Sequence, residues 1–285
     1  MISRIDSLRE VGKTVKNSFI RKTAFIVTAA VFLFSATMVV RHRIEMNIGA
    51  EKADVVIQMA VTHIPDQEES PKETETVFPS QQPENEDENN PDPEPAAPIQ
   101  VDFDALFKEN QDVVAWLYCP DTPINYPVVQ STDNNYYLRR LLDKSYNSLG
   151  TLFIDCRNAG DFSDWNSVIY GHNMKNDSMF GTLPNYKNPV YFQEHPELFL
   201  LTPDKDYCIH LIAGFTTPAN SELYSIFAPD SAEASRLIEN WIVSSDFDSG
   251  IRPSAEDRLI TLSTCSYEYD NARYVLIGIL KECRR

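Results

Sequence analysis

Apolar side chains follow three different patterns along this chain. From Ala24 to Val40 they form one run without a charged residue. Residues 64–98 contain almost none, and from Val101 onward short apolar runs alternate with turn-forming residues. The first pattern is typical of a membrane-spanning helix, the second of a segment that cannot fold by itself, and the third of a β-rich domain.

The apolar run at residues 24–40 predicts a membrane anchor. As a helix it would span roughly 26 Å, at about 1.5 Å per residue, close to the roughly 30 Å hydrocarbon core of a bilayer. Residues 41–43, "RHR", follow it where a cleaved signal peptide would have small residues, so we favour an uncleaved signal-anchor at 23–43 over a cleaved signal. The basic residues of the tail 1–22 predict a cytoplasmic N-terminus and place everything beyond Val40 outside the cell, which makes this a single-pass protein of the cell membrane. These basic residues are Arg4, Arg9, Lys13, Lys16, Arg21 and Lys22.

The polar stretch at residues 64–98 predicts a spacer. It holds eleven acidic residues, eight prolines and the single basic residue Lys72, and so carries −10 of the formal net charge of −17. Such a composition cannot bury enough surface to offset its ordering entropy, so we interpret residues 44–100 as a juxtamembrane segment and a disordered spacer that holds a domain away from the membrane. The negative charge also argues against a nucleic-acid partner, because phosphate binding needs a basic face.

The folded domain is predicted over residues 101–285. Apolar residues at helix-like spacings within 102–119 predict an N-terminal helix with Asp102 as its cap. Later short runs rich in Val, Ile, Tyr, Phe and Thr predict a β-barrel or a β-sandwich. One helix is expected to interrupt these strands, over residues 231–245.

The five cysteines are odd in number and widely spaced. They form no CxxC pair, so a zinc ribbon has no support, and a dense disulfide framework is not expected in a chain of this length. At least one thiol is therefore expected to be free. Cys119, Cys156, Cys208 and Cys283 are interpreted as structural residues, and Cys265 is the candidate nucleophile.

Cys265 ends the apolar run "LITLSTC", and Arg273 opens the next one, "RYVLIGILK". If the two runs pair as an antiparallel hairpin, these two residues lie side by side, and the period of two places Ser263 on the face of Cys265. A guanidinium beside a thiol favours the thiolate and offers donors to a developing oxyanion. Arg273 cannot accept the proton, because a guanidinium stays charged.

A cysteine nucleophile also needs a group that transfers protons, and histidine is the usual one. Among the five histidines, His172 follows the apolar strand "SVIYGH", where Gly171 leaves room for a close approach. The sequence therefore predicts a Cys265–His172 pair, with ordinary structural roles for both residues as the alternative.

Several motifs in the predicted domain resemble those of one enzyme family. "TLSTC" followed by Arg273, and "YGHNM" with "SMFGTL", resemble the signatures of sortases, the cysteine transpeptidases of Gram-positive cell surfaces. "DVVAWLYCPDTPINYPVVQSTDNNYYL" and "GTLFIDCRN" resemble class B sortases in particular. The resemblance covers about residues 101–285, and its motifs occur in the expected order.

The resemblance implies a sortase-type closed β-barrel of about eight strands, with an N-terminal helix and a long helix between two late strands. It implies that Cys265 is the nucleophile, that His172 is the general acid and base, and that Arg273 holds the substrate backbone and stabilises the oxyanion. Ser263 resembles a position that lines the peptide groove. No metal and no organic cofactor is implied.

The implied function is that of a membrane-anchored transpeptidase. Such an enzyme cleaves the C-terminal sorting motif of secreted proteins after a threonine and joins the acyl group to an amine of a peptidoglycan precursor or cross-bridge. Class B relatives often accept motifs that begin Asn-Pro. The alternatives are a pilin-polymerising sortase that uses a Lys amine, a cell-wall cysteine peptidase that transfers to water, and a surface module without catalysis.

Overall fold

The computed structural model describes residues 2–64, 95–227 and 229–284. The chain divides into two compact units, Met1–Ile48 and Gly49–Arg285. Helix α1 (Ile2–Ala60) contains, from Lys22 onward, an 18-residue window with a mean hydropathy of 2.2, so by length and composition it is able to cross a membrane. Most of the predicted acidic spacer lies outside the described residues.

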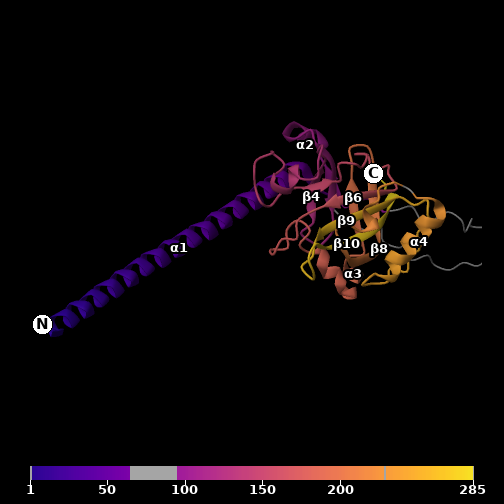
Figure 1. Ribbon diagram of the computed structural model, residues 1–285. Coiled ribbons are helices and arrows are strands. Elements are labelled where there is room, and N and C mark those ends of the chain that lie inside the picture. The colour runs from indigo at the N-terminus through magenta and orange to yellow at the C-terminus, as the bar shows by residue number, and fades with distance from the viewer. Residues whose placement is uncertain (1, 65–94, 228, 285) are drawn as a thin grey trace, which may run out of the picture. The chain divides into compact units, whose positions relative to one another are not determined.

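The second unit is built on a closed eight-stranded barrel, as predicted (Figure 1). Around the barrel the strand order is β10-β8-β7-β3-β4-β5-β6-β9. The pairs β4–β5 and β6–β9 are parallel and the remaining pairs are antiparallel. The strands are β3 (Val113–Tyr118), β4 (Asn125–Val129), β5 (Leu152–Ile154), β6 (Asn166–Tyr170), β7 (Glu197–Leu201), β8 (Asp206–Pro218), β9 (Leu259–Cys265) and β10 (Ala272–Glu282).

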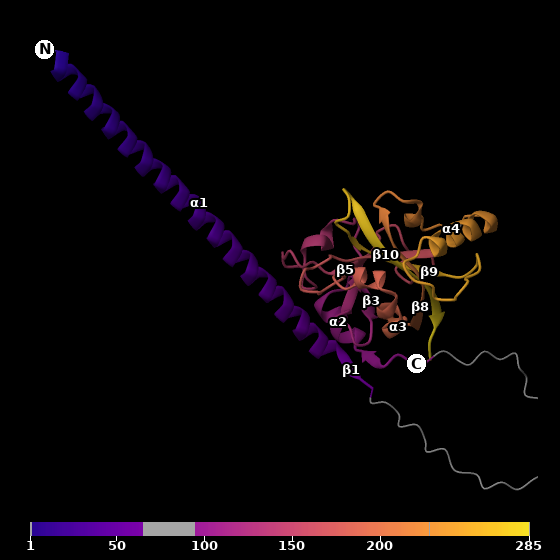
Figure 2. The same ribbon diagram turned by 90° about the horizontal axis from the view of Figure 1, so that it is seen from below.

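Helices cover the outside of the barrel and its connections. Both views place α4 (Ser231–Val243) beside β8, and this is the long helix predicted at 231–245 (Figures 1 and 2). Its cap is Asp230, whose carboxylate accepts a hydrogen bond from the backbone N–H of Glu233. The other helices are α2 (Phe103–Glu109), α3 (Pro189–Glu194) and the 3₁₀ turns η1 (Tyr136–Arg139), η2 (Leu183–Lys187) and η3 (Glu222–Tyr224).

The helix predicted within residues 102–119 is only half correct. Asp102 caps α2 as expected, but α2 ends at Glu109 and residues 113–118 form strand β3. Asn110 has an extended backbone at the end of α2, and its buried side chain donates hydrogen bonds to the Tyr137 hydroxyl and the Leu142 carbonyl. The β-branched and aromatic residues after it then pair with β4 and β7.

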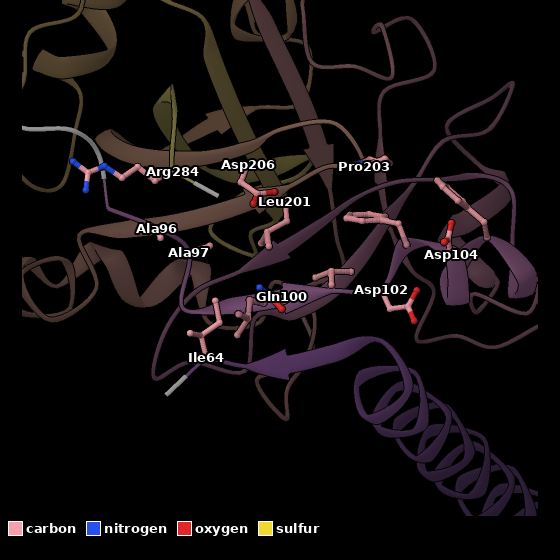
Figure 3. A pocket seen from close by; sticks show the side chains of 14 residues that line it. Ile64, Ala96, Ala97, Gln100, Asp102, Asp104, Leu201, Pro203, Asp206 and Arg284 are labelled. Atoms are coloured by element: carbon pink, nitrogen blue, oxygen red, sulfur yellow. The ribbon is translucent and has the colours of Figure 1, made fainter. Parts of the chain in front are cut away.

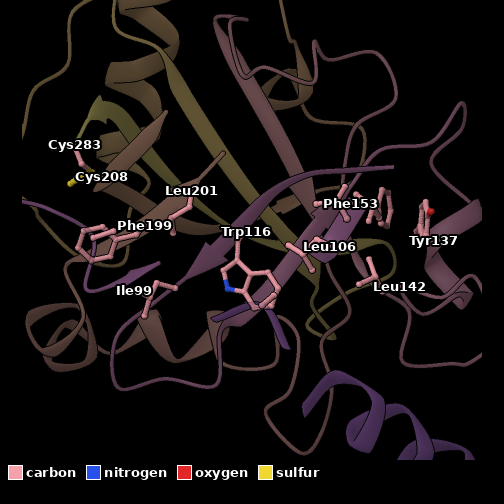
Figure 4. Close-up of a cluster of buried hydrophobic side chains, with 14 residues drawn as sticks. Ile99, Leu106, Trp116, Tyr137, Leu142, Phe153, Phe199, Leu201, Cys208 and Cys283 are labelled. Atoms are coloured by element: carbon pink, nitrogen blue, oxygen red, sulfur yellow. A yellow bond between two sulfur atoms is a disulfide. The ribbon is translucent and has the colours of Figure 1, made fainter. Parts of the chain in front are cut away.

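A hydrophobic cluster fills one side of the barrel. Trp116 of β3 lies in its middle, fully buried, with Ile99 and Leu106 around it (Figure 4). A second cluster lies under α4, where the rings of Trp165 and Trp241 pack at 6.0 Å between centroids. These two clusters hold the strands in place around the site described below.

The cysteines were predicted only in part. Cys119, Cys156 and Cys265 are free thiols, which confirms that at least one thiol is unpaired. Cys208 of β8 and Cys283 form a disulfide that the sequence did not predict, because 75 residues separate them. The antiparallel pairing of β8 with β10 brings the start of β8 beside the end of β10.

The compact unit begins earlier than the predicted domain. It starts at Gly49, whereas the sequence predicts a domain that starts at residue 101. Residues 49–60 are the end of α1, and they lead into strand β1 (Val61–His63), which pairs with β2 (Ile99–Val101). Residues on both sides of the acidic segment therefore pack with the barrel.

Candidate active site

Cys265 and Arg273 lie directly opposite each other at the end of the β9–β10 ladder. The two strands are antiparallel, as predicted, and their pairing starts at this residue pair and continues to Ile279 opposite Leu259. Cys265 is a free thiol and, like Arg273, is half-buried, while Thr264 and Tyr274 beside them are buried. A thiol and a guanidinium thus share one rim of the barrel.

The segment that carries His172 reaches the same rim through the parallel pairing of β6 with β9. Tyr170, the last residue of β6, lies opposite Ser263. Gly171 then donates its N–H to the Ser263 carbonyl at 3.1 Å and accepts a hydrogen bond from the Thr264 hydroxyl at 2.8 Å. The side-chain amide of Asn173 donates to the Cys265 carbonyl at 2.8 Å. The Gly171 backbone and the Asn173 side chain, on either side of His172, are therefore hydrogen-bonded to residues 263–265.

Gly171 is required by close packing at this point. A Cβ built there would lie 2.5 Å from Leu152 and 2.6 Å from Phe180, closer than real Cβ atoms approach. The sequence predicted room for a close approach at Gly171, and the approaching groups are these two apolar side chains. They hold the turn that presents His172.

The imidazole of His172 is oriented by a backbone carbonyl. Its Nε2 lies 2.7 Å from the carbonyl oxygen of Leu138, in η1. A carbonyl can only accept, so Nε2 carries the proton and donates it, and Nδ1 is left as the nitrogen that can exchange protons. This contact comes from a segment 34 residues away, and no feature of the sequence pointed to it.

Ser263 is buried below the rim and bonds to a residue that the sequence did not identify. Its hydroxyl lies 2.9 Å from the hydroxyl of Tyr224. Burial raises the pKa of Tyr224, the charge of Arg273 opposes that effect, and Cys265 adds to it. The Tyr224 hydroxyl thus contacts the residue that stands two positions before Cys265 on β9.

A cavity of about 580 Å³ adjoins Tyr224. The ring of Tyr224 stacks on Tyr170, with 6.2 Å between centroids, and the Tyr170 hydroxyl donates to the buried carboxylate of Asp155 at 2.9 Å. Arg157 forms two hydrogen bonds to that carboxylate, at 2.8 and 2.9 Å. Burial alone would raise the pKa of Asp155, but the hydrogen bonds from Arg157 and Tyr170 outweigh it and lower the pKa to about 2. All four side chains line the cavity, so one wall is aromatic and one carries a fixed ion pair.

The sequence offered only partial signals for these cavity residues. Tyr170 ends the strand before His172, and Asp155 with Arg157 follows the strand "GTLFI", so all three stand at strand ends near the predicted site. Tyr224 lies in a loop with no readable pattern. Within residues 2–64, 95–227 and 229–284, no group of three or more His, Cys, Asp and Glu side chains is arranged to hold a metal ion, and the absence of a metal stays a prediction.

Comparisons with known proteins identify close relatives of this chain, although no protein-family model matches it. The curated sortase B of Listeria monocytogenes is 35% identical over 177 residues, which cover 61% of this chain and 72% of the relative. A crystal structure of sortase B from B. anthracis is 32% identical, with a TM-score of 0.58, and the match covers 63% of this chain and 84% of that chain.

A structure of the Staphylococcus aureus sortase B–substrate complex has the same fold. It is 24% identical to this chain, with a TM-score of 0.61 over 64% of this chain and 85% of that chain. Sortase B has also been solved in complex with triglycine, in a structure that matches this chain with a TM-score of 0.60.

Proposed function

This chain belongs to the sortase B family and is a cysteine transpeptidase, and from that premise we propose that it cleaves the C-terminal sorting motif of secreted proteins and joins the acyl group to an amine of peptidoglycan. The observation that carries the proposal is the juxtaposition at the barrel rim. Arg273 lies opposite Cys265, and the two neighbours of His172, Gly171 through its backbone and Asn173 through its side chain, are hydrogen-bonded to residues 263–265. This supports the roles proposed for Cys265 as nucleophile, His172 as proton carrier and Arg273 as oxyanion donor.

In the first step, the Cys265 thiolate attacks the carbonyl carbon of the residue before the scissile bond. The carbonyl oxygen becomes an oxyanion, and the guanidinium of Arg273 stabilises it. The protonated imidazole of His172 gives a proton to the leaving nitrogen, the C–N bond breaks, and a thioester to Cys265 remains. Because Nε2 of His172 is held by the Leu138 carbonyl, Nδ1 is the atom that moves the proton.

In the second step, an amine attacks the thioester. His172 takes the proton from the attacking nitrogen, Arg273 again stabilises the oxyanion, and the C–S bond breaks to give a new amide and the free thiolate. The triglycine complex of a relative supports an amine terminus as the acceptor, and the substrate complex supports a peptide as the donor.

The donor peptide is proposed to lie along the cavity that begins at Tyr224. Ser263 stands two residues before Cys265 on β9 and its hydroxyl lies 2.9 Å from that of Tyr224, so a peptide whose carbonyl is at Cys265 would extend its preceding residues past these side chains. The stacked rings of Tyr170 and Tyr224 offer an apolar surface, and Arg157 offers donors to a peptide carbonyl.

Membrane anchoring is part of the proposal. The apolar window in α1 is the candidate span, with the tail 1–22 in the cytoplasm and the catalytic domain outside. A substrate that is held in the same membrane by its own apolar segment would then reach the active site by diffusion in the plane of the membrane.

The test uses the full chain in detergent with peptides of the form Asn-Pro-Xaa-Thr-Xaa and triglycine as the acceptor. Mass spectrometry should detect the amide product, and Cys265→Ala should abolish both transfer and hydrolysis. Acid as the sole product would favour a peptidase, and preference for a Lys side-chain amine over triglycine would favour a pilin-polymerising sortase. A Cys265→Ala variant with full transfer would disprove the proposal.

A further inference from the structure

We infer that the acidic segment at residues 65–94 is an insertion into the catalytic unit, and that the unit is attached to the membrane anchor through the end of α1. Residues 49–60 are called the docked helix end, and residues 65–94 the acidic insertion. The sequence alone suggested the opposite, a spacer between anchor and domain. This inference depends on the proposed anchor but not on the proposed reaction.

The docked helix end buries one face. Gly49 and Ala60 are buried, Lys52, Ala53, Val56 and Ile57 are half-buried, and these six positions follow the spacing of a single helix face. On the opposite face, Val55 is 58% exposed and Met59 is 43% exposed. Ala60, at 3% exposure, belongs to the same hydrophobic cluster as Trp116.

Polar and close-packed contacts fix the same helix end to the segment 143–149. The Lys52 Nζ lies 2.5 Å from the carboxylate of Asp143 and 3.1 Å from the hydroxyl of Ser145. At Gly49, a Cβ would lie 3.0 Å from the side chain of Asn147, so a larger residue there would push against this segment. The contact is therefore specific in charge and in shape.

The residues that flank the acidic insertion are held together. His63 pairs with Ile99 in the antiparallel β1–β2 ladder, and the Ile64 N–H donates to the Pro98 carbonyl at 3.0 Å. Figure 3 shows Ile64 and Gln100 on these neighbouring segments, around a cavity of about 490 Å³. The chain thus leaves the catalytic unit at Ile64 and rejoins it at the same edge.

The returning end is anchored a second time. Ala96 forms a β-bridge with Arg284, next to Cys283 and its disulfide to Cys208. The Cys208 sulfur lies 3.5 Å from the carbonyl oxygen of Pro95. The residues that precede β2 are therefore part of the catalytic unit and not a free linker.

This arrangement limits the reach of the catalytic unit. Only residues 41–48 connect the apolar run, which ends at Val40, to the docked helix end, and eight residues span at most about 28 Å. The 34 residues at 65–98 would add more than about 100 Å if they were the tether, but Ile64, which precedes them, is hydrogen-bonded to Pro98, and so they add no length to it. The catalytic unit is therefore confined to substrates close to the bilayer.

Cleavage inside the acidic insertion tests this inference. A site for a specific protease is inserted between Pro79 and Ser80 of the full chain, which is expressed in membranes, and the catalytic fragment is followed by its C-terminal tag after cleavage and sedimentation. We expect this fragment to stay with the membranes. Release to the extent seen with the same protease site between Ile44 and Glu45 would overturn the inference, and so would retention after cleavage at that control site.

Variants of the docked helix end sharpen the test. In the protein cleaved at Pro79, Lys52→Glu should release the catalytic fragment, and Lys52→Glu combined with Asp143→Lys should restore retention, because the pair is reformed with its charges exchanged. Val55→Asp, on the exposed face, is the matched control and should leave retention unchanged. Equal retention for Lys52→Glu and Val55→Asp would contradict docking through this face. Sedimentation is scored without activity, so an error in the proposed reaction would not alter the result.

Discussion

Two antiparallel ladders of this protein, β9–β10 and β1–β2, are formed in opposite ways. The partners Cys265 and Arg273 are eight residues apart, whereas His63 and Ile99 are 36 residues apart with the acidic insertion between them. The first ladder ends in a half-buried thiol and guanidinium, and the second carries apolar residues into the cluster around Trp116. In our proposals the first ladder supplies the chemistry at the barrel rim, and the second sets where the domain is attached.

The largest expected effect comes from removing the guanidinium of the β9–β10 ladder, which should affect catalysis and not stability. Arg273→Ala should lower kcat/KM for transfer by about 10²–10³, because the oxyanion loses its donor. The free energy of unfolding should change by less than about 0.5 kcal/mol, because Arg273 is half-exposed. Transfer kinetics and urea unfolding of the same preparation measure the two quantities. The exposed Arg252, whose guanidinium pairs with Asp248 four residues earlier, provides the matched control as Arg252→Ala. A loss of transfer that is explained by unfolding would contradict the assigned role.

The converse prediction concerns the second ladder. Ile99→Ala should lower the free energy of unfolding by about 3 kcal/mol, because Ile99 is 2% exposed and leaves a cavity beside Trp116. The next residue in the strand, Gln100, is exposed, and Gln100→Ala should cost less than about 0.5 kcal/mol. Urea unfolding followed by tryptophan fluorescence measures both. If both variants unfolded like the unaltered chain, β2 would not belong to the catalytic unit.

The contrast between the ladders also explains what the sequence could predict. The β9–β10 hairpin was predicted correctly because two apolar runs flank a short polar loop. The same kind of local signal predicted a barrel or a sandwich, and the resemblance to sortases implied the closed barrel that the structure has. The β1–β2 ladder was missed because its strands have three residues each and are separated by a long segment without apolar pattern. The docked face of α1 was also missed, because the interpretation of this part of the sequence rested on the apolar run that predicts a membrane span.

The residues of the candidate site also fall into those that the sequence could predict and those that it could not. Cys265 and Arg273 stand at the ends of readable strands, so their pairing was predictable, and His172 follows a strand that pairs with β9; the catalytic site of these three residues stays a prediction. The Leu138 carbonyl and Tyr224 reach the rim from irregular segments, and only tertiary packing decides where those segments lie. Residue types in loops do not predict such contacts.

A third prediction concerns pH and the cavity near the first ladder. The pKa of Asp155 is lowered to about 2 in the folded protein, so its carboxylate adds stability above its ordinary pKa of 3.8, and this stability is lost as the pH falls from about 4 to 2. Arg157→Ala leaves this buried carboxylate without the guanidinium and should cost about 2 kcal/mol at pH 7. The difference from the unaltered chain should shrink toward pH 2, where Asp155 becomes protonated. Urea unfolding at pH 7, 5 and 3 measures it, and a difference that does not depend on pH would exclude this cause.

The smallest expected effect tests whether the rim and the cavity form one binding surface. Tyr224→Phe removes the hydroxyl that lies 2.9 Å from the Ser263 hydroxyl and keeps the ring stacked on Tyr170. This hydrogen bond fixes two side chains on the proposed peptide path, so its loss, about 1 kcal/mol, should raise KM for the donor peptide by no more than about five-fold and leave kcat within about two-fold. Tyr224→Ala also removes the stacked ring and should raise KM further. Steady-state kinetics with the donor peptide varied at saturating triglycine separates KM from kcat. A fall in kcat with unchanged KM would instead place the Tyr224 hydroxyl among the groups that act in the transition state, and the division between a chemical rim and a binding cavity would then be wrong.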